Sequence, residues 1–545
     1  MSHPECLVTL PGVTTLKRVI VAAMLMMTTT TAHPGEVLYN GIRLPDQWPP
    51  RPASFYRDKP LTPPYLVKPP DVIPIDVGRQ LFVDDFLIAE TTLKRTFHQP
   101  EFHPASPIFK AEKTWEIRRD TGSAAPFSGG VWYDPADRTF KMWYMAGTGC
   151  FFGYATSQDG IHWERPKLNT TRYGDNVLDI EPIQRDSSTV WLDLEETDPA
   201  RRFKMMYYRA GLHMRVSADG IHWSESLGAP GGSSDRNTFF YNPFRNVWVY
   251  SIRGSARDVG RCRFYGESPK FGVPLWKSFR ELPMWSCADS LDRVKPVEYV
   301  EERPDLYNLD AAPYESLMLG LFSIHAKVTA GDRPKINYVT IGFSRDGFHW
   351  DRPDRRPFLD VSEDRNAWNY GNVQSAGGGC LVMGDKLYFY CSGRNSRKNP
   401  DDGSGISTGL AMLRRDGFAS MDAAQTVGTL TTRPVTFNGK HLFVNVLSPQ
   451  GALRAEVLDE QGQPIAPYTI ENSATLRTDS THAALAWKGA ADLAPLTGRT
   501  VRFRFQLENG SLYSFWVSPD QSGASHGYVA AGGAGFTGHR DTTGQ

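Results

Sequence analysis

Short apolar segments with the spacing of β-strands, each bounded by turn residues, run from about residue 75 to residue 517. In the segments 132–144, 198–208 and 241–250, Pro after Asp or Asn begins a turn, and aromatic or β-branched residues stand on both sides. Such residues suit a pleated surface, and Asp, Asn and Pro suit a tight turn. A fourth segment keeps only its second strand, 317–322, and a fifth turns at 384–386. The pattern predicts five β-hairpins in succession.

A seven-residue motif follows the hairpins. Its full copies are Ser157–Trp163, Ser217–Trp223 and Ser344–Trp350, with a worn copy at Arg414–Phe418 and a remnant at Gly266–Ser268. The full copies begin 60 and 127 residues apart, and the second interval is about two units. Self-similarity at a fixed period indicates a repeat architecture, and five units of short strands predict an all-β fold with a five-bladed β-propeller. Each blade sends its first strand to the axis, where we expect the site.

The motif itself has a structural interpretation. Asp-Gly favours a hairpin turn with positive φ at Gly, the Ser and Asp side chains can bond nearby backbone groups, and Trp can pack between blades. Because the motif recurs, its histidines, His162, His222 and His349, are predicted to be turn residues and not catalysts.

The pattern changes after the propeller, which we assign to residues 75–427. Apolar and polar residues alternate in 441–446, 453–458 and 501–507, and Asn509-Gly510 forms a hairpin turn. This predicts a β-sandwich over residues 428–521. The tail, 522–545, is rich in Gly, Ser and Thr and is predicted to be disordered.

The segment before the repeats is rich in Pro. Residues 33–74 show little periodicity and are predicted to form an extended arm on the surface. Ordered structure is expected to begin at Ile75, and Leu81–Ile88 has the composition of a strand that closes the ring of blades.

The N-terminus has the features of an export signal over residues 1–32. Lys17 and Arg18 precede an apolar run at 19–27, and Thr30–Ala32 offers small residues for cleavage. Nine apolar residues are too few to span a bilayer. We therefore expect a secreted or periplasmic protein that does not enter the membrane.

Net charge and composition limit the kinds of molecule that the protein is expected to bind. Lys plus Arg equals Asp plus Glu at 60 each, which gives no attraction to nucleic acid or to an anionic membrane. Aromatic residues make up 12% and could form blade cores or platforms for sugar rings. We expect a monomer that binds an oligo- or polysaccharide, with no cofactor and no metal site, because no metal-ligand spacing or phosphate loop is present.

Five cysteines remain after the leader, and they form no CxxC motif. This predicts neither a disulfide framework nor a zinc site. Cys380 and Cys391 could pair across adjacent strands or remain buried thiols.

These repeats and the S-x-D-G-x-x-W turns resemble the glycoside hydrolase clan that contains families 32 and 43. The resemblance covers roughly residues 75–425, and the predicted sandwich is similar to the C-terminal domain of family 32. It implies cleavage of a glycosidic bond by carboxylates gathered at the mouth of the axial channel.

The resemblance also implies particular residues. Arg185-Asp186-Ser187 is similar to the family's Arg-Asp-Pro motif, which implies a transition-state role for Asp186. Glu302–Tyr307 is similar to the family's acid/base segment, although it falls in blade four where blade three is expected. The segment 126–131 has no acid where the family carries its nucleophile. A retaining mechanism requires both groups, at about 5–5.5 Å.

The repeats give further candidate site residues, because the first strand of each unit is expected to lie at the axis. Carboxylates gathered there would repel, so one could hold a proton as a general acid. Asp186 and Asp235 are the first catalytic pair to consider, with Asp310 or Glu302 as proton donor. The candidate substrate-binding residues are Arg185, Arg236, Asn237, Trp368, Asn372 and Gln374. Arg236 could lower the pKa of a neighbouring carboxyl or bind an anionic sugar, and Trp368 could stack on a sugar or simply pack.

Two other functions fit the same features. One is a carbohydrate-binding propeller whose catalytic groups have decayed, favoured by the missing acid at 126–131. The other is a glycoside phosphorylase, in which Arg236, Arg394 and Arg397 would hold phosphate.

Overall fold

The computed structural model describes residues 35–51, 60–118, 121–147, 151–180, 188–228, 235–257, 259–273, 276–292, 304–326, 333, 335–395 and 405–544. Within these ranges the chain is nearly all β, as predicted, with one short α-helix, α1 (Pro64–Val67). No helix in the described ranges is long and apolar enough to cross a membrane. The described 3₁₀ helices are η1 (Thr114–Glu116), η2 (Phe127–Gly129), η3 (Pro199–Arg201), η4 (Phe279–Glu281), η5 (Ser290–Asp292) and η7 (Ala494–Leu496).

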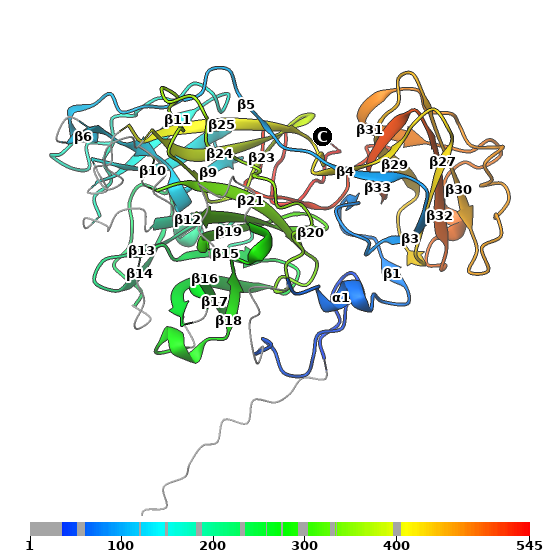
Figure 1. The fold of residues 1–545 in the computed structure, drawn as a ribbon, viewed down its shortest axis with the longest axis horizontal. Coiled ribbons are helices and arrows are strands. Elements are labelled where there is room, and N and C mark those ends of the chain that lie inside the picture. The colour runs from blue at the N-terminus through cyan, green and yellow to red at the C-terminus, as the bar shows by residue number, and fades with distance from the viewer. Residues whose placement is uncertain are drawn as a thin grey trace, which may run out of the picture.

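Five antiparallel sheets follow one another along residues 101–414 (Figure 1). The first three are built from consecutive strands. The first sheet contains β8 (Ala124–Ala125), β9 (Val131–Asp134), β10 (Thr139–Ala146) and β11 (Phe151–Ser157); the second contains β12 (Ser188–Leu192), β13 (Phe203–Tyr208) and β14 (Leu212–Ser217); the third contains β15 (Thr238–Asn242), β16 (Val247–Ala256), β17 (Gly260–Ser268) and β18 (Met284–Cys287).

The fourth and fifth sheets each include a short strand from a distant part of the chain. The fourth contains β19 (Asp305–Glu315), β20 (Leu317–His325), β21 (Asn337–Ser344) and β34 (Tyr528–Val529); the fifth contains β22 (Asn372–Ser375), β23 (Leu381–Met383), β24 (Lys386–Arg394), β25 (Ser407–Arg414) and β5 (Glu101–Phe102). A small ribbon of β6 (Ile117–Arg118) and β7 (Thr121–Gly122) lies outside them.

Neighbouring sheets touch near their first strands. β12 contacts η2 beside the first sheet, β15 contacts β12, β19 contacts β15, and β22 contacts β20 and β21. The fifth sheet returns to the first, because β22 also contacts η2. The five sheets share one hydrophobic core, which includes Trp143, Tyr207, Tyr250, Phe322 and Phe389.

Copies of the repeated motif lie at one end of these sheets. Ser157 at the end of β11 pairs with Phe140 near the start of β10, and Ser344 at the end of β21 pairs with Met318 near the start of β20. Ser268, in the predicted remnant, ends β17 and pairs with Trp248 in the same way. Because each second strand runs back from the end of its first strand, the first strands begin at the opposite end.

The motif has the predicted turn chemistry. In the first copy, Ser157 Oγ accepts a hydrogen bond from the Gly160 amide at 2.9 Å, and Gly160 has a φ of +74°. Asp159 Oδ1 accepts from the amide of His162 at 2.8 Å, and His162 Nδ1 lies 2.7 Å from Asp159 Oδ2. The same bonds recur in the other two full copies, so all three histidines hold turns.

A second group of sheets lies beside the first (Figure 1). Side chains of both its sheets meet in a second hydrophobic core, in which Phe82 stacks on Phe515. One sheet contains β2 (Gln80–Leu81), β4 (Lys94–Phe97), β26 (Ala419–Ala423), β29 (His441–Leu447), β31 (Asp479–Leu485) and β33 (Gly510–Ser518); the other contains β3 (Ile88–Thr91), β27 (Gly428–Thr432), β30 (Ala452–Leu458) and β32 (Arg502–Glu508). β1 (Ile73–Pro74) pairs with β28 (Val435–Thr436) at its side.

Two predictions about the N-terminal region need correction. The segment Leu81–Ile88 does not close the first group, because β2 and β3 pair with β33 and β27 of the second group. The strand that joins the fifth sheet is β5, which pairs with β25. The arm is not confined to the surface either, since Leu38, Ile42 and Tyr65 are buried in the second core.

The tail, for which the sequence predicted disorder, instead connects several sheets. β34 pairs with the end of β19, the Ala531 amide donates to Cys380 O, and the Tyr133 amide donates to Ala531 O. Its small residues permit close backbone approach: a Cβ on Gly533 would lie 1.8 Å from Val382 O. The Gly and Ala content therefore reflects tight packing against strands that are distant in the sequence.

Cys380 and Cys391 are both buried thiols and form no disulfide. This matches the second of the two alternatives that the sequence left open.

Candidate active site

A buried carboxyl, that of Asp310, lies on the first strand of the fourth sheet. Asp310 is the middle residue of β19, and its side chain has the same orientation as that of Asn308 because residues two apart in a strand share a face. Only 3% of Asp310 is exposed. A carboxyl so deeply removed from water requires partners, and they come from η2 and from the fourth and fifth sheets.

Neutral groups make the direct contacts to Asp310. The hydroxyl of Ser375, on β22, donates to Asp310 Oδ2 at 2.5 Å, and Asn308 Nδ2 donates to the same oxygen at 2.8 Å. Asn308 Nδ2 also lies 3.1 Å from the hydroxyl of Ser128 in η2, which itself hydrogen-bonds Asp310. Ser323 on β20 lies 3.4 Å from Ser375. Residues of η2 and of strands in the fourth and fifth sheets therefore hold one carboxyl.

Burial controls the protonation of this carboxyl. Removal from water raises the pKa of Asp310, while the charges of Arg236 and Arg263 and the hydroxyls of Ser375 and Ser128 oppose the shift without cancelling it. A carboxyl whose pKa is raised holds its proton to higher pH. Asp310 thus has the property required of a general acid.

Cations gather beside this carboxyl, around the ring of Tyr307 at the start of β19. The guanidinium carbon of Arg261 lies 3.9 Å from the ring centroid, that of Arg236 5.6 Å, and Lys335 Nζ 5.2 Å. Arg263, on β17, is fully buried, and its pKa is lowered by burial and by the neighbouring charges of Arg261 and Arg236. Among the described residues, three cations therefore gather around one ring, with the carboxyls of Asp305 and Asp310 nearby.

Several buried polar atoms nearby have no hydrogen-bond partner among the described residues. They are Arg263 Nη1, Asn308 Oδ1, Gln374 Oε1, and both Oδ1 and Nδ2 of Asn337. Buried donors and acceptors are nearly always satisfied in folded proteins. A polar ligand or water could satisfy these atoms, which are carried by β17, β19, β21 and β22.

The predicted residues before β15 are placed differently from one another. Asp235 is 27% exposed at its side chain and forms an ion pair with Arg253 at 2.6 Å. Arg236 is fully buried with a φ of +57°, and Asn237 Oδ1 accepts from the Arg253 amide at 2.8 Å. Arg236 lies close enough for its charge to oppose the raised pKa of Asp310, while Asp235 pairs with Arg253.

The predicted residues of the fifth sheet lie close to the same region. Gln374 Nε2 donates to Asn372 Oδ1 at 2.9 Å, and Asn372 Nδ2 donates to Lys335 O at 3.0 Å. Arg394 is the strand partner of Asn372 and is buried. The ring of Trp368 instead lies over the backbones of β24 and β25, where a Cβ at Gly393 or Gly409 would meet it at 2.1 Å. Trp368 fills the place of a packing residue.

Asp186, Glu302, Arg185 and Arg397 lie outside the described residues, so their predicted roles stay predictions. Within the described ranges, no group of three His, Cys, Asp or Glu side chains could hold a metal ion.

Sequence reasoning missed Asn308, Ser375, Ser128, Arg263 and Tyr307. The spacing Asn308-x-Asp310 carried a usable signal, since two polar residues on one face of an otherwise apolar strand indicate a buried polar site. Ser375 and Ser128 gave no comparable signal, because their importance depends on contacts between different sheets.

No protein-family model matches the chain, and no curated protein matches it. Solved structures that resemble it are glycoside-active enzymes, the group that the sequence resembles. A β-1,2-mannobiose phosphorylase from Listeria innocua is 13% identical with a TM-score of 0.38, over 58% of this chain and 96% of that one. A β-fructofuranosidase from Schwanniomyces occidentalis is 11% identical with a TM-score of 0.35, over 77% and 97%.

A third is a protein of the GH130 family of mannoside phosphorylases, 12% identical with a TM-score of 0.39, over 63% of this chain and 99% of that one. All three TM-scores are below 0.5, so these likenesses carry no weight in assigning residues or chemistry.

Proposed function

We propose that the chain is an exported enzyme that cleaves a glycosidic bond at the axis of a five-bladed β-propeller with an attached β-sandwich. Five sheets in cyclic contact support the propeller, and two sheets around a second core support the sandwich. The leader-like residues 1–32 support export.

The observation that carries the proposal is the setting of Asp310. A carboxyl with a raised pKa, held by groups from η2 and from the first strands of the fourth and fifth sheets, is suited to protonate the oxygen of a leaving sugar. Arg236, Asn372 and Gln374 are then positioned for the substrate. For hydrolysis, the second carboxyl would come from Asp186, Asp235 or Glu302.

A second candidate, phosphorolysis, is favoured by the cations around Tyr307. Phosphate brings its own nucleophilic oxygen, so this reaction requires only one protein carboxyl, to protonate the leaving oxygen. Arg236, Arg261 and Lys335 supply the charge that would hold the phosphate.

The test is turnover of plant and algal oligosaccharides by the purified protein, with and without inorganic phosphate. Asp310→Asn should lower turnover by at least about 10²-fold, the usual contribution of a general acid, while changing the thermal unfolding temperature only slightly. Cleavage that requires phosphate would select phosphorolysis, and cleavage without it would select hydrolysis. Sugar binding without turnover under both conditions would contradict the proposed enzyme and leave a binding protein. Unchanged turnover in Asp310→Asn would remove Asp310 from the mechanism.

A further inference from the structure

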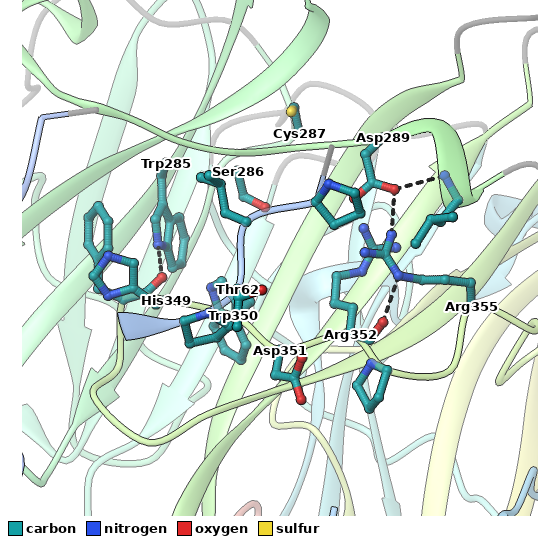
Figure 2. Close-up of a pocket in the computed structure, with 16 residues that line it drawn as sticks. Thr62, Trp285, Ser286, Cys287, Asp289, His349, Trp350, Asp351, Arg352 and Arg355 are labelled. Carbon is teal, nitrogen blue, oxygen red and sulfur yellow. Dashed lines mark hydrogen bonds and ion pairs between the residues drawn. The ribbon is translucent and has the colours of Figure 1, made fainter. Parts of the chain in front are cut away.

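A cavity of about 310 Å³ lies outside the central site, at the end of the sheets that carries the repeated motif. Its walls come from three segments: arm residues 60–63, β18 with the turn that follows it, and residues 348–355, which contain the end of the third full motif copy. Figure 2 shows these segments around one space. The volume is at the lower end of the range for small-molecule sites, about 300–1,000 Å³.

The cavity forms because other segments cover the third copy of the motif, while the first two copies are exposed to solvent. In the first two copies, His162 and His222 are exposed, with 87% and 75% of their side chains accessible. In the third, His349 is only 22% accessible, and its carbonyl accepts a hydrogen bond from Tyr65 OH in α1. The arm and β18 therefore convert an ordinary turn into one wall of an enclosed space.

The lining combines aromatic rings with polar groups. Trp350 lines the cavity, and its ring centroid lies 6.0 Å from that of Trp285. Trp285 and Phe348 are almost completely buried, at 4% and 3% exposed, so Trp350 is the ring of the three with an accessible face. Leu61 and Leu291 are large apolar residues at its edge that remain more than half exposed, at 53% and 51%. Apolar rings beside a few convergent polar groups are the usual composition of a ligand site.

The lining carries equal numbers of acidic and basic side chains, and one of the acids has no partner among the described residues. Arg352 pairs with Asp292, and Arg355 Nη1 lies 2.8 Å from Asp289 Oδ1. Asp351 lines the cavity, and among the described residues its carboxylate has no hydrogen-bond or ion-pair partner (Figure 2). Two acids and two arginines make the lining neutral overall, which disfavours a charged ligand.

We propose that this cavity is a second binding site, separate from the Asp310 centre, for one neutral saccharide unit. The ring of Trp350 would pack against the C–H face of the sugar, and Asp351 would accept hydrogen bonds from its hydroxyls. Neither contact depends on catalysis at Asp310. The site would hold a glycan chain on the protein independently of cleavage.

Binding of cellobiose, xylobiose and mannobiose, measured by isothermal titration calorimetry on the full chain, tests the proposal. Asp351→Asn should weaken the binding of at least one disaccharide by about tenfold or more, since hydrogen bonds to charged groups carry that much. Thr62→Trp, at an exposed lining position, should fill the cavity and abolish binding without disturbing the core.

The matched control is Glu164→Gln. Glu164 occupies the position of Asp351 in the first copy, and its backbone pairs with Thr156 as that of Asp351 pairs with Phe343. Glu164→Gln should leave binding unchanged, and Asp310→Asn should leave the cavity's binding unchanged. No binding of any of the three disaccharides, or equal binding by wild type and Thr62→Trp, would overturn the proposal. Loss of all binding in Asp310→Asn would also overturn it and assign the sugar to the centre.

Discussion

Two buried carboxyls on the same strand, Asp310 and Glu315, have opposite kinds of surroundings. Asp310 is held by neutral hydroxyl and amide donors. Glu315, the last residue of β19, accepts from the Arg79 amide at 3.0 Å, lies 3.2 Å from Arg415 Nη2, and accepts from the Ser525 hydroxyl at 2.7 Å. Burial raises the pKa of both carboxyls and arginine charges oppose the shift at both, but at Glu315 the arginines form ion pairs with the carboxylate itself.

The difference separates a chemical role from a structural one. The cluster of Glu315 contains Arg79, Arg415, Asp416 and Asp541, and it joins the first group of sheets to the second group and to the tail. Such paired charges hold segments in place. A buried carboxyl with neutral partners keeps a proton available, which is the property that catalysis uses.

Removal of residues 522–545 should lower the free energy of unfolding most, because it takes away part of the Glu315 cluster. The truncated chain loses Ser525 and Asp541 from the cluster and buried apolar residues such as Tyr528, Val529 and Phe536. Each large apolar side chain contributes about 1.5–3 kcal/mol, so the free energy of unfolding should fall by several kcal/mol. Urea unfolding followed by tryptophan fluorescence measures it. Removal of residues 542–545 alone retains Asp541 and should cost little; equal stability of both truncations and wild type would show that the tail is dispensable.

Arg415→Met should have the next largest effect. The change leaves three carboxyls with only Arg79, and breaking one partner of a buried ion pair costs about 3–5 kcal/mol. Thermal and urea unfolding both report it. Asp85→Asn provides the control, because the side chain of Asp85 is 74% exposed in its pair with Arg95 and the change should cost less than about 1 kcal/mol. A similar loss of unfolding free energy in Arg415→Met and Asp85→Asn would show that the Glu315 cluster does not stabilise the fold.

Asp310→Asn should change stability least and with a definite pH dependence. The pKa of Asp310 is raised in the folded state, so its favourable contribution is complete below the unfolded pKa of about 3.9 and is lost as pH rises through the folded value. Relative to wild type, the variant should therefore become more stable as pH increases from 4 toward 7. Urea unfolding of both proteins at several pH values measures this difference. A difference that is constant with pH would mean that Asp310 is not protonated above its ordinary range.

Much of the first group of sheets could be predicted because its signals are local. The Asp-Gly turns of the motif and the Asp-Pro or Asn-Pro hairpins are specified by neighbouring residues, and they gave the five units directly. The Ser268 remnant was identified correctly because it still ends a third strand. The beginnings of first strands likewise pointed to Asp310, Arg236 and Gln374.

The remainder depends on contacts between distant residues, which composition does not reveal. The tail was misjudged because Gly and Ala indicate either a flexible segment or a closely packed one. β2 and β3 have ordinary strand composition, and only their partners place them in the second group. Within the site, Ser375 and Ser128 matter through bonds that cross between sheets. The packing of Trp368 could not be foreseen either, because the glycines beneath it are 25 and 41 residues away, and its role in sugar binding stays a prediction.

The pairing of both flanking segments with the sheets has a consequence for biogenesis. Phe102 finds its partner Ala411 only after about 300 further residues have been synthesised, and β34 follows its partner β19 by about 200 residues. Nascent chains that lack β34 and Asp541 cannot complete the fourth sheet or the Glu315 cluster. The fourth and fifth sheets therefore keep unpaired strand edges until partners distant in the sequence have been made.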